Sequence, residues 1–139
     1  FSEREKKHSP EHKRNEKLYG ANSGQTETLN MLPDEEYDKL LSENIVFLDM
    51  YDSSANNAII ESIARATPVL TNPLPAITEY LGSDYPLYFE SLEEAAKKAS
   101  DLGLIKEAHQ YLLECDTRKK LTPESFRKAL RESEVYNLL

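Results

Sequence analysis

Residues 44–82, NIVFLDMYDSSANNAIIESIARATPVLTNPLPAITEYLG, alternate between strand-like and helix-like patterns. Residues 44–48 are a short apolar run rich in β-branched and aromatic side chains, which is typical of a buried strand. The polar residues 52–54 supply N-cap side chains for a helix over 55–66. A Thr-Pro pair ends that helix, and residues 69–71 begin a second strand. The stretch therefore predicts a β-α-β unit, the building block of a parallel sheet.

The helix of this unit begins at the carboxyl end of its first strand, the edge where open α/β sheets bind ligands. Free backbone N–H groups and the helix dipole favour an anion at such a helix start. We expect the N–H groups of Asn56, Asn57 and Ala58 to face that anion. Glu61 follows Asn57 by four residues and so lies on the same face, roughly 6 Å further along the axis. This pattern suits a nucleotide diphosphate, because acidic side chains accept hydrogen bonds from ribose hydroxyls in dinucleotide-binding folds.

Residues 54–70, SANNAIIESIARATPVL, resemble the donor-binding segment of two-domain (GT-B) glycosyltransferases of the retaining, family 4-like group. The resemblance extends over about residues 26–100. It implies that the helix start takes the diphosphate of a nucleotide-sugar, through Asn57 and Ala58, and that Glu61 takes the ribose. Glu79 matches a Glu that follows the next loop of the family. The expected donor-binding residues are Ser54, Asn56, Asn57, Ala58, Glu61 and Glu79.

Several positions depart from the family pattern. Ser53 stands where many members carry a second Glu, eight positions before the helix Glu. Residues 73–76, Pro-Leu-Pro-Ala, replace a Gly-Gly loop, and the two prolines stiffen the loop and remove donors. The Arg and Lys that the family places near the start of this domain have no recognisable counterpart, and the acceptor-side domain is absent. No residue is identified as a general base or a nucleophile.

The composition favours one acidic domain. The chain has 139 residues and a net charge of −8, and a domain of that length buries roughly two thirds of its unfolded surface. Residues 1–20 hold six Lys and Arg against four Asp and Glu, whereas the remainder holds eleven against twenty-one. An acidic body argues against nucleic-acid binding and against an anionic membrane surface.

The sequence gives no sign of a secreted or membrane-spanning protein. Cys115 is the only cysteine, so an internal disulfide is excluded and a reducing compartment fits best. No apolar run approaches the 18 or more residues of a spanning helix, and no signal-peptide pattern opens the chain. We therefore expect a soluble, cytoplasmic protein. The chain begins at Phe1 rather than Met, which is consistent with a fragment or a processed chain.

Other motifs are weighed against simpler interpretations. Asp49 and Asp52 follow the first strand as in receiver domains, but the acidic pair and the Lys of a receiver are missing. His8 and His12 have Pro10 between them and too few further ligands for a metal site. Cys115 lacks a nucleophile motif and is expected in a helix core. The basic residues within 1–20 form either a solvated charge run or a group that holds a phosphate.

The rest of the chain predicts further strands and helices around this unit. Residues 34–42 predict a helix with Tyr37, Leu40 and Leu41 as its buried stripe. Pro86 confines the strand at 85–89 to a sheet edge. The other predicted elements are a flexible or surface segment at 1–25, a strand at 26–31 and helices at 76–81, 91–100, 104–115 and 123–139.

The fold class that follows is α/β, a partial Rossmann-like three-layer domain with a short parallel sheet and C-terminal helices. The expected division is a charged segment at 1–25, a nucleotide-sugar-binding domain at 26–103 and C-terminal helices at 104–139. The resemblance implies a glycosyltransferase that uses a nucleotide-diphosphate sugar as its donor substrate, without a metal or another cofactor. Its partner would be an acceptor-binding domain or chain. The alternative is an α/β module without catalysis that serves interaction.

Overall fold

Two short parallel strands lie at the centre of the described structure. The computed structural model describes residues 29–52 and 56–137. Strand β1 (Val46–Leu48) pairs in parallel with β2 (Val69–Thr71), so that Val46 lies opposite Val69 and Leu48 opposite Thr71. Helix α4 (Asn57–Arg65) connects the two strands. The predicted β-α-β unit is therefore confirmed, within a mixed α/β architecture that is mostly helical.

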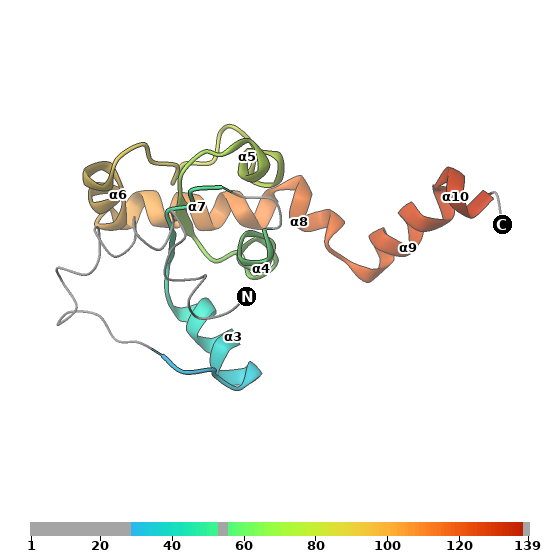
Figure 1. The fold of residues 1–139 in the computed structure, drawn as a ribbon, viewed down its shortest axis with the longest axis horizontal. Coiled ribbons are helices and arrows are strands. Elements are labelled where there is room, and N and C mark those ends of the chain that lie inside the picture. Colours follow the sequence, from blue (N-terminus) through green and yellow to red (C-terminus); the bar gives the residue numbers. More distant parts are fainter. Residues whose placement is uncertain (1–28, 53–55, 138–139) are drawn as a thin grey trace, which may run out of the picture. The chain divides into compact units, whose positions relative to one another are not determined.

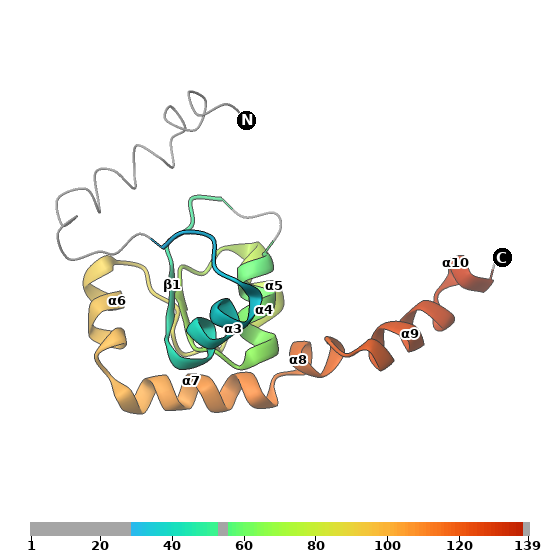
Figure 2. The same ribbon diagram turned by 90° about the horizontal axis from the view of Figure 1, so that it is seen from below.

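The helices lie on both sides of these strands. Figures 1 and 2 show α6 on one side of the strands and α4 and α5 on the other. The contacts divide the chain into two units, Phe1–Glu36 and Tyr37–Leu139. The remaining helices are α3 (Asp34–Glu43), α5 (Pro75–Leu81), α6 (Leu92–Ala99), α7 (Leu102–Glu114), α8 (Asp116–Lys120), α9 (Pro123–Glu132) and α10 (Glu134–Asn137).

One apolar core joins the strands to α4, α5, α6 and α7. Each fully buried Leu or Ile side chain stabilises the fold by about 1.5–3 kcal/mol relative to an exposed one. Ala66 forms the C-cap of helix α4, with a left-handed φ of 55°, and donates its N–H to the Ile63 carbonyl. The buried core residues are Ile59, Ile63, Ala66, Val69, Leu70, Ile77, Leu81, Tyr85, Leu87, Phe89, Ala95, Ala108 and Leu112.

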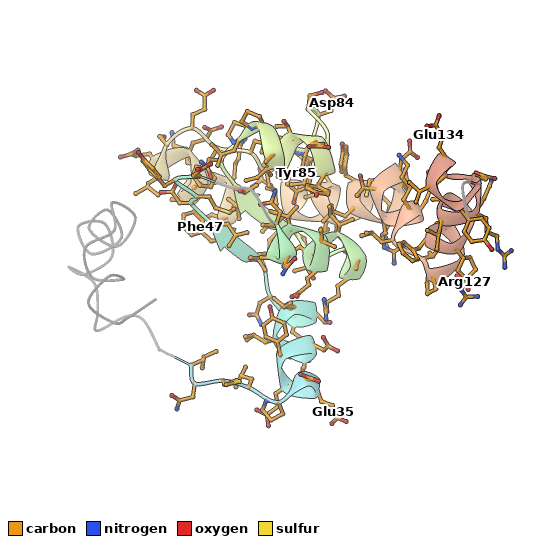
Figure 3. All side chains as sticks on the ribbon, turned by 45° about the vertical axis from the view of Figure 1, so that its right-hand side comes forward. Glu35, Phe47, Asp84, Tyr85, Arg127 and Glu134 are labelled. Carbon is orange, nitrogen blue, oxygen red and sulfur yellow. The ribbon has the colours of Figure 1, made fainter. Side chains whose placement is uncertain are left out.

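The predicted edge strand at 85–89 is reduced to one bridge, between Thr71 and Tyr88. Thr71 donates its N–H to the Leu87 carbonyl at 3.3 Å, so this segment does lie beside β2. The ladder does not extend further because the hydroxyl of Tyr85, a residue labelled in Figure 3, accepts the Val69 N–H at 2.9 Å. A buried side chain thus takes the place of a backbone partner, next to a proline that has no N–H to give.

Other differences from the predicted elements lie at the two ends of the chain. Residues 29–31 form no strand, while 1–28 lie outside the described residues. The helix expected at 123–139 is interrupted at Ser133, whose φ and ψ are extended, and the short helix α8 was not predicted. The expected buried stripe of α3 is wrong, because Tyr37 is 39% and Leu40 36% exposed and polar contacts hold this helix instead. Within the described ranges, no helix has the length and apolar character to cross a membrane.

The Tyr85 hydroxyl predicts a measurable stability effect. Tyr85 is buried, and burial raises the pKa of its phenol. Replacing Tyr85 by Phe leaves the Val69 N–H without an acceptor, so we expect a loss of roughly 1–3 kcal/mol in the free energy of unfolding, measured in urea. Tyr136→Phe, at a half-exposed position, should change it by less than about 0.5 kcal/mol. Equal effects of the two substitutions would contradict the role of the hydroxyl.

A second effect on stability is expected at Gly82. Its φ of 81° and ψ of 163° belong to a region that is essentially restricted to glycine. A Cβ there would lie 2.6 Å from the Tyr111 hydroxyl, which itself donates to the Leu81 carbonyl at 2.7 Å. We expect Gly82→Ala to lower the free energy of unfolding, measured in urea, by roughly 1–3 kcal/mol. Gly103→Ala, within α7 and without a positive φ, is the control. Its Cβ would lie 3.2 Å from Asp101 Oδ1, so that side chain must shift slightly, and the substitution should cost less than Gly82→Ala.

Candidate functional site

The carboxyl ends of β1 and β2 meet at one edge, where a side-chain amide joins them. The Asn72 side chain accepts the Met50 N–H through Oδ1 at 2.9 Å and donates to the Met50 carbonyl through Nδ2 at 2.7 Å. Both backbone groups of Met50 are therefore satisfied by one residue at the end of the neighbouring strand. This arrangement fixes the loop that leads from β1 to α4 against the loop that leads from β2 to α5.

The start of α4 carries three of the predicted donor-binding residues. Asn56 occupies the N-cap position, but its side chain makes no capping bond. It is buried, and its Nδ2 donates to the Ala76 carbonyl of α5 at 3.0 Å. Asn57 and Ala58 are exposed in the first turn, where backbone N–H groups have no partner within a helix. The predicted residue Ser54 lies outside the described residues.

Glu61 lies one turn further along α4 and is half-buried. The Tyr37 hydroxyl donates to its Oε2 at 2.9 Å, and this hydrogen bond raises the pKa of Tyr37. Beside it, Arg65 forms an ion pair with Asp38 of α3 and donates from Nε at 3.1 Å. The carboxylate of Glu61 is thus held in a fixed direction at the contact between α3 and α4.

A third contact completes the attachment of α3. The Thr67 hydroxyl donates to the Leu41 carbonyl at 2.8 Å, near the last turn of that helix. Helix α3 is therefore attached through three polar contacts, two to α4 and one to Thr67, which follows α4, and it partly covers the face of α4 that carries Glu61. The sequence analysis did not predict the contact between α3 and α4, because it assigned Tyr37 to an apolar stripe. The only features of the sequence that pointed to a polar contact were the acidic first turn of α3 and the tyrosine hydroxyl.

Glu79 lies on α5, exposed and outside the α4 start. It lines a groove of about 450 Å³ between the end of α5 and the junction of α7 with α8. Tyr111 and Cys115 line the same groove, and Cys115 is half-buried with its Sγ directed at the Leu112 carbonyl, 3.3 Å away. The structure therefore brings Asn57, Ala58 and Glu61 together on one helix, with Glu79 in a separate groove.

The loop between β2 and α5 has few backbone N–H groups free to bind a ligand. The Leu74 N–H binds the Asn72 carbonyl at 2.9 Å, and Pro73 and Pro75 have no N–H. Pro75 is the first residue of α5, a favoured place for proline. This loop consequently offers fewer backbone donors to a ligand than a glycine loop would.

No group of three or more His, Cys, Asp and Glu side chains suited to a metal ion occurs among residues 29–52 and 56–137.

Comparison with known proteins found no match to a family model, to a curated protein or to a solved structure.

We expect the side-chain amide of Asn72 to stabilise this edge of the sheet. Replacing Asn72 by Ala removes both bonds to Met50 and leaves its N–H and carbonyl to find other partners. We expect a loss of roughly 1–3 kcal/mol in the free energy of unfolding, measured in urea. Asn44→Ala, which removes one exposed bond to the Leu40 carbonyl, is the matched control and should cost about 0.5 kcal/mol or less. Similar losses in the two variants would show that Asn72 does not fix this edge.

Proposed function

We propose that this chain is the donor-binding portion of a glycosyltransferase, which transfers a sugar from a nucleotide-diphosphate sugar to an acceptor. We also propose that the α/β fold of this chain is a partial Rossmann-like three-layer domain. The observation that supports it best is the β1-α4-β2 unit with Glu61 one turn below an exposed helix start. This is the arrangement in which a helix N-terminus takes a phosphate and a carboxylate takes a ribose hydroxyl.

In this proposal the contribution of the chain is electrostatic and positional. The N–H groups of the first turn of α4, at Asn57 and Ala58, offset the charge of the diphosphate as it leaves the sugar. The bond from Tyr37 to Oε2 orients the Glu61 carboxylate, so that Oε1 is directed to the ribose. Because the acceptor is bound by another domain or chain, we expect little or no turnover by residues 1–139 alone.

A second candidate is an α/β interaction module without catalysis. Two observations favour it: the side chain of Asn56 is bonded to α5, and that of Asn72 to Met50. Both amides lie at the edge where a ligand would bind, and both serve to hold loops together. The proline-containing loop after β2 points in the same direction, because it offers fewer donors.

Calorimetry with uridine diphosphate and guanosine diphosphate tests the donor-binding role. We expect one of them to bind the full chain and Glu61→Gln to weaken that binding about tenfold or more, since a bond to a charged acceptor contributes roughly 1.5–3 kcal/mol. Tyr37→Phe keeps the carboxylate and should weaken binding less. Glu107→Gln, on the exposed face of α7, is the matched control and should have no effect.

Two outcomes would decide against the proposal. If neither nucleotide gives heat at millimolar concentration, the interaction module is favoured. If a nucleotide binds equally well to the wild-type chain and to Glu61→Gln, Glu61 is not a ligand, and its carboxylate serves only to attach α3 through Tyr37.

A further inference from the structure

Helix α9 carries an apolar stripe that is not buried. Phe126 and Leu130 lie one turn apart on the same face, and they are 67% and 47% exposed. No residue of α9 is buried. Arg127 and Arg131 flank this stripe one position further along each turn, since i and i+4 residues share a face. We call the stripe formed by Phe126 and Leu130 the α9 ridge.

A groove of complementary character lies between β1 and α6. Its volume is about 260 Å³, and three alanines of α6 line one wall, leaving room for a large side chain. Phe47 of β1, labelled in Figure 3, lines the opposite wall. Its ring stacks on that of Phe89, with 5.4 Å between ring centres, so this wall is well defined. The groove, called the α6 groove, is lined by Ile45, Phe47, Leu70, Leu92, Ala95, Ala96 and Ala99.

The α9 ridge does not reach the α6 groove of its own chain. Helix α8 is fastened on the α4 and α5 side of the strands, because Thr117 donates to the Tyr80 carbonyl at 2.6 Å and Arg118 to the Ala64 carbonyl at 3.4 Å. Ser125 of α9 in turn donates to the Lys119 carbonyl at 3.0 Å. Helix α7, with 13 residues and hence about 20 Å long, separates this attachment from α6.

The distribution of charge favours a second copy as the occupant. Described residues up to 115 hold sixteen Asp and Glu against five Lys and Arg, whereas residues 116–137 hold six Lys and Arg against four Asp and Glu. Two acidic bodies repel each other unless a basic segment lies between them. The acidic residues near α6 lie around its start, at Glu90, Glu93 and Glu94, next in sequence to Leu92 of the groove, whereas Lys97 and Lys98 lie in its last turn. Arg127 and Arg131 of another copy would therefore be attracted to the Leu92 end of the groove.

We propose that two copies of this chain associate reciprocally, each inserting its α9 ridge into the α6 groove of the other. One three-turn helix in one groove is small beside the roughly 1,200 Å² or more that stable interfaces bury. A symmetric exchange makes the contact twice and closes the assembly at a dimer. The proposal concerns a surface outside the α4 start, and it is independent of nucleotide binding.

Sedimentation equilibrium of the full chain, up to about 0.5 mM, tests this association. We expect a monomer–dimer equilibrium that Phe126→Asp and Ala96→Arg each weaken roughly tenfold or more, because each removes an apolar contact from both halves of the dimer. Both positions are exposed, so the variants should fold, which circular dichroism checks. Met31→Glu, at a position that is 98% exposed, is the control and should dimerise as the wild type does.

Mixing the two monomeric variants gives the sharpest test. Phe126→Asp keeps an intact groove and Ala96→Arg keeps an intact ridge, so a heterodimer of the two retains one of the two contacts. The mixture should therefore associate more strongly than either variant alone and more weakly than the wild type. A dimer that persists in Ala96→Arg and is lost in Phe126→Asp would indicate pairing of α9 with α9 and would overturn the proposal. A wild-type chain that stays monomeric throughout the concentration range would overturn it as well.

Discussion

The parallel pairing of β1 with β2 is the constraint on which the rest of the described structure depends. A parallel pair requires a crossover, and here α4 supplies it. Both strands then end at the same edge, which brings the loop before α4 against the loop before α5. Only because of this can Asn72 reach Met50 and Asn56 reach Ala76. A ladder this short has little stability of its own, so its geometry is maintained by the apolar core on its faces.

Helix α3 is attached in a different way, and this bears on Glu61. Its contacts with α4 are a hydroxyl–carboxylate bond and an exposed ion pair, Tyr37 with Glu61 and Asp38 with Arg65. Exposed ion pairs contribute about 0–1 kcal/mol each, so α3 is held less firmly than α5 or α7, which bury apolar side chains in the core. A ligand that takes the Glu61 carboxylate therefore either shares it with Tyr37 or displaces a weakly held helix.

Sequence patterns predicted the central unit and most helices, because β-branched runs, capping residues and apolar spacing are local signals. They failed where a distant side chain decides the backbone structure: the strand at 85–89 could not be seen to lose its ladder to the Tyr85 hydroxyl. The position of Glu61 on α4 followed from spacing, but its bond to Tyr37, 24 residues away in sequence, required the packing of α3 on α4. For the same reason the amide contacts of Asn56 and Asn72 were not predicted. The assignment of donor-binding roles to these residues stays a prediction.

The charges of the described residues limit how a diphosphate can be held. A helix start stabilises an anion by about 0.3–1 kcal/mol, up to about 2 in partly buried geometries, whereas millimolar affinity already requires about 4 kcal/mol. Arg65, the basic residue of α4, is paired with Asp38, and the surrounding chain is acidic. A nucleotide-diphosphate bound at α4 would therefore need positive charge from elsewhere. An acceptor-binding partner is the source consistent with the proposed function, and in that case the tight site exists only when α4 and the partner act together.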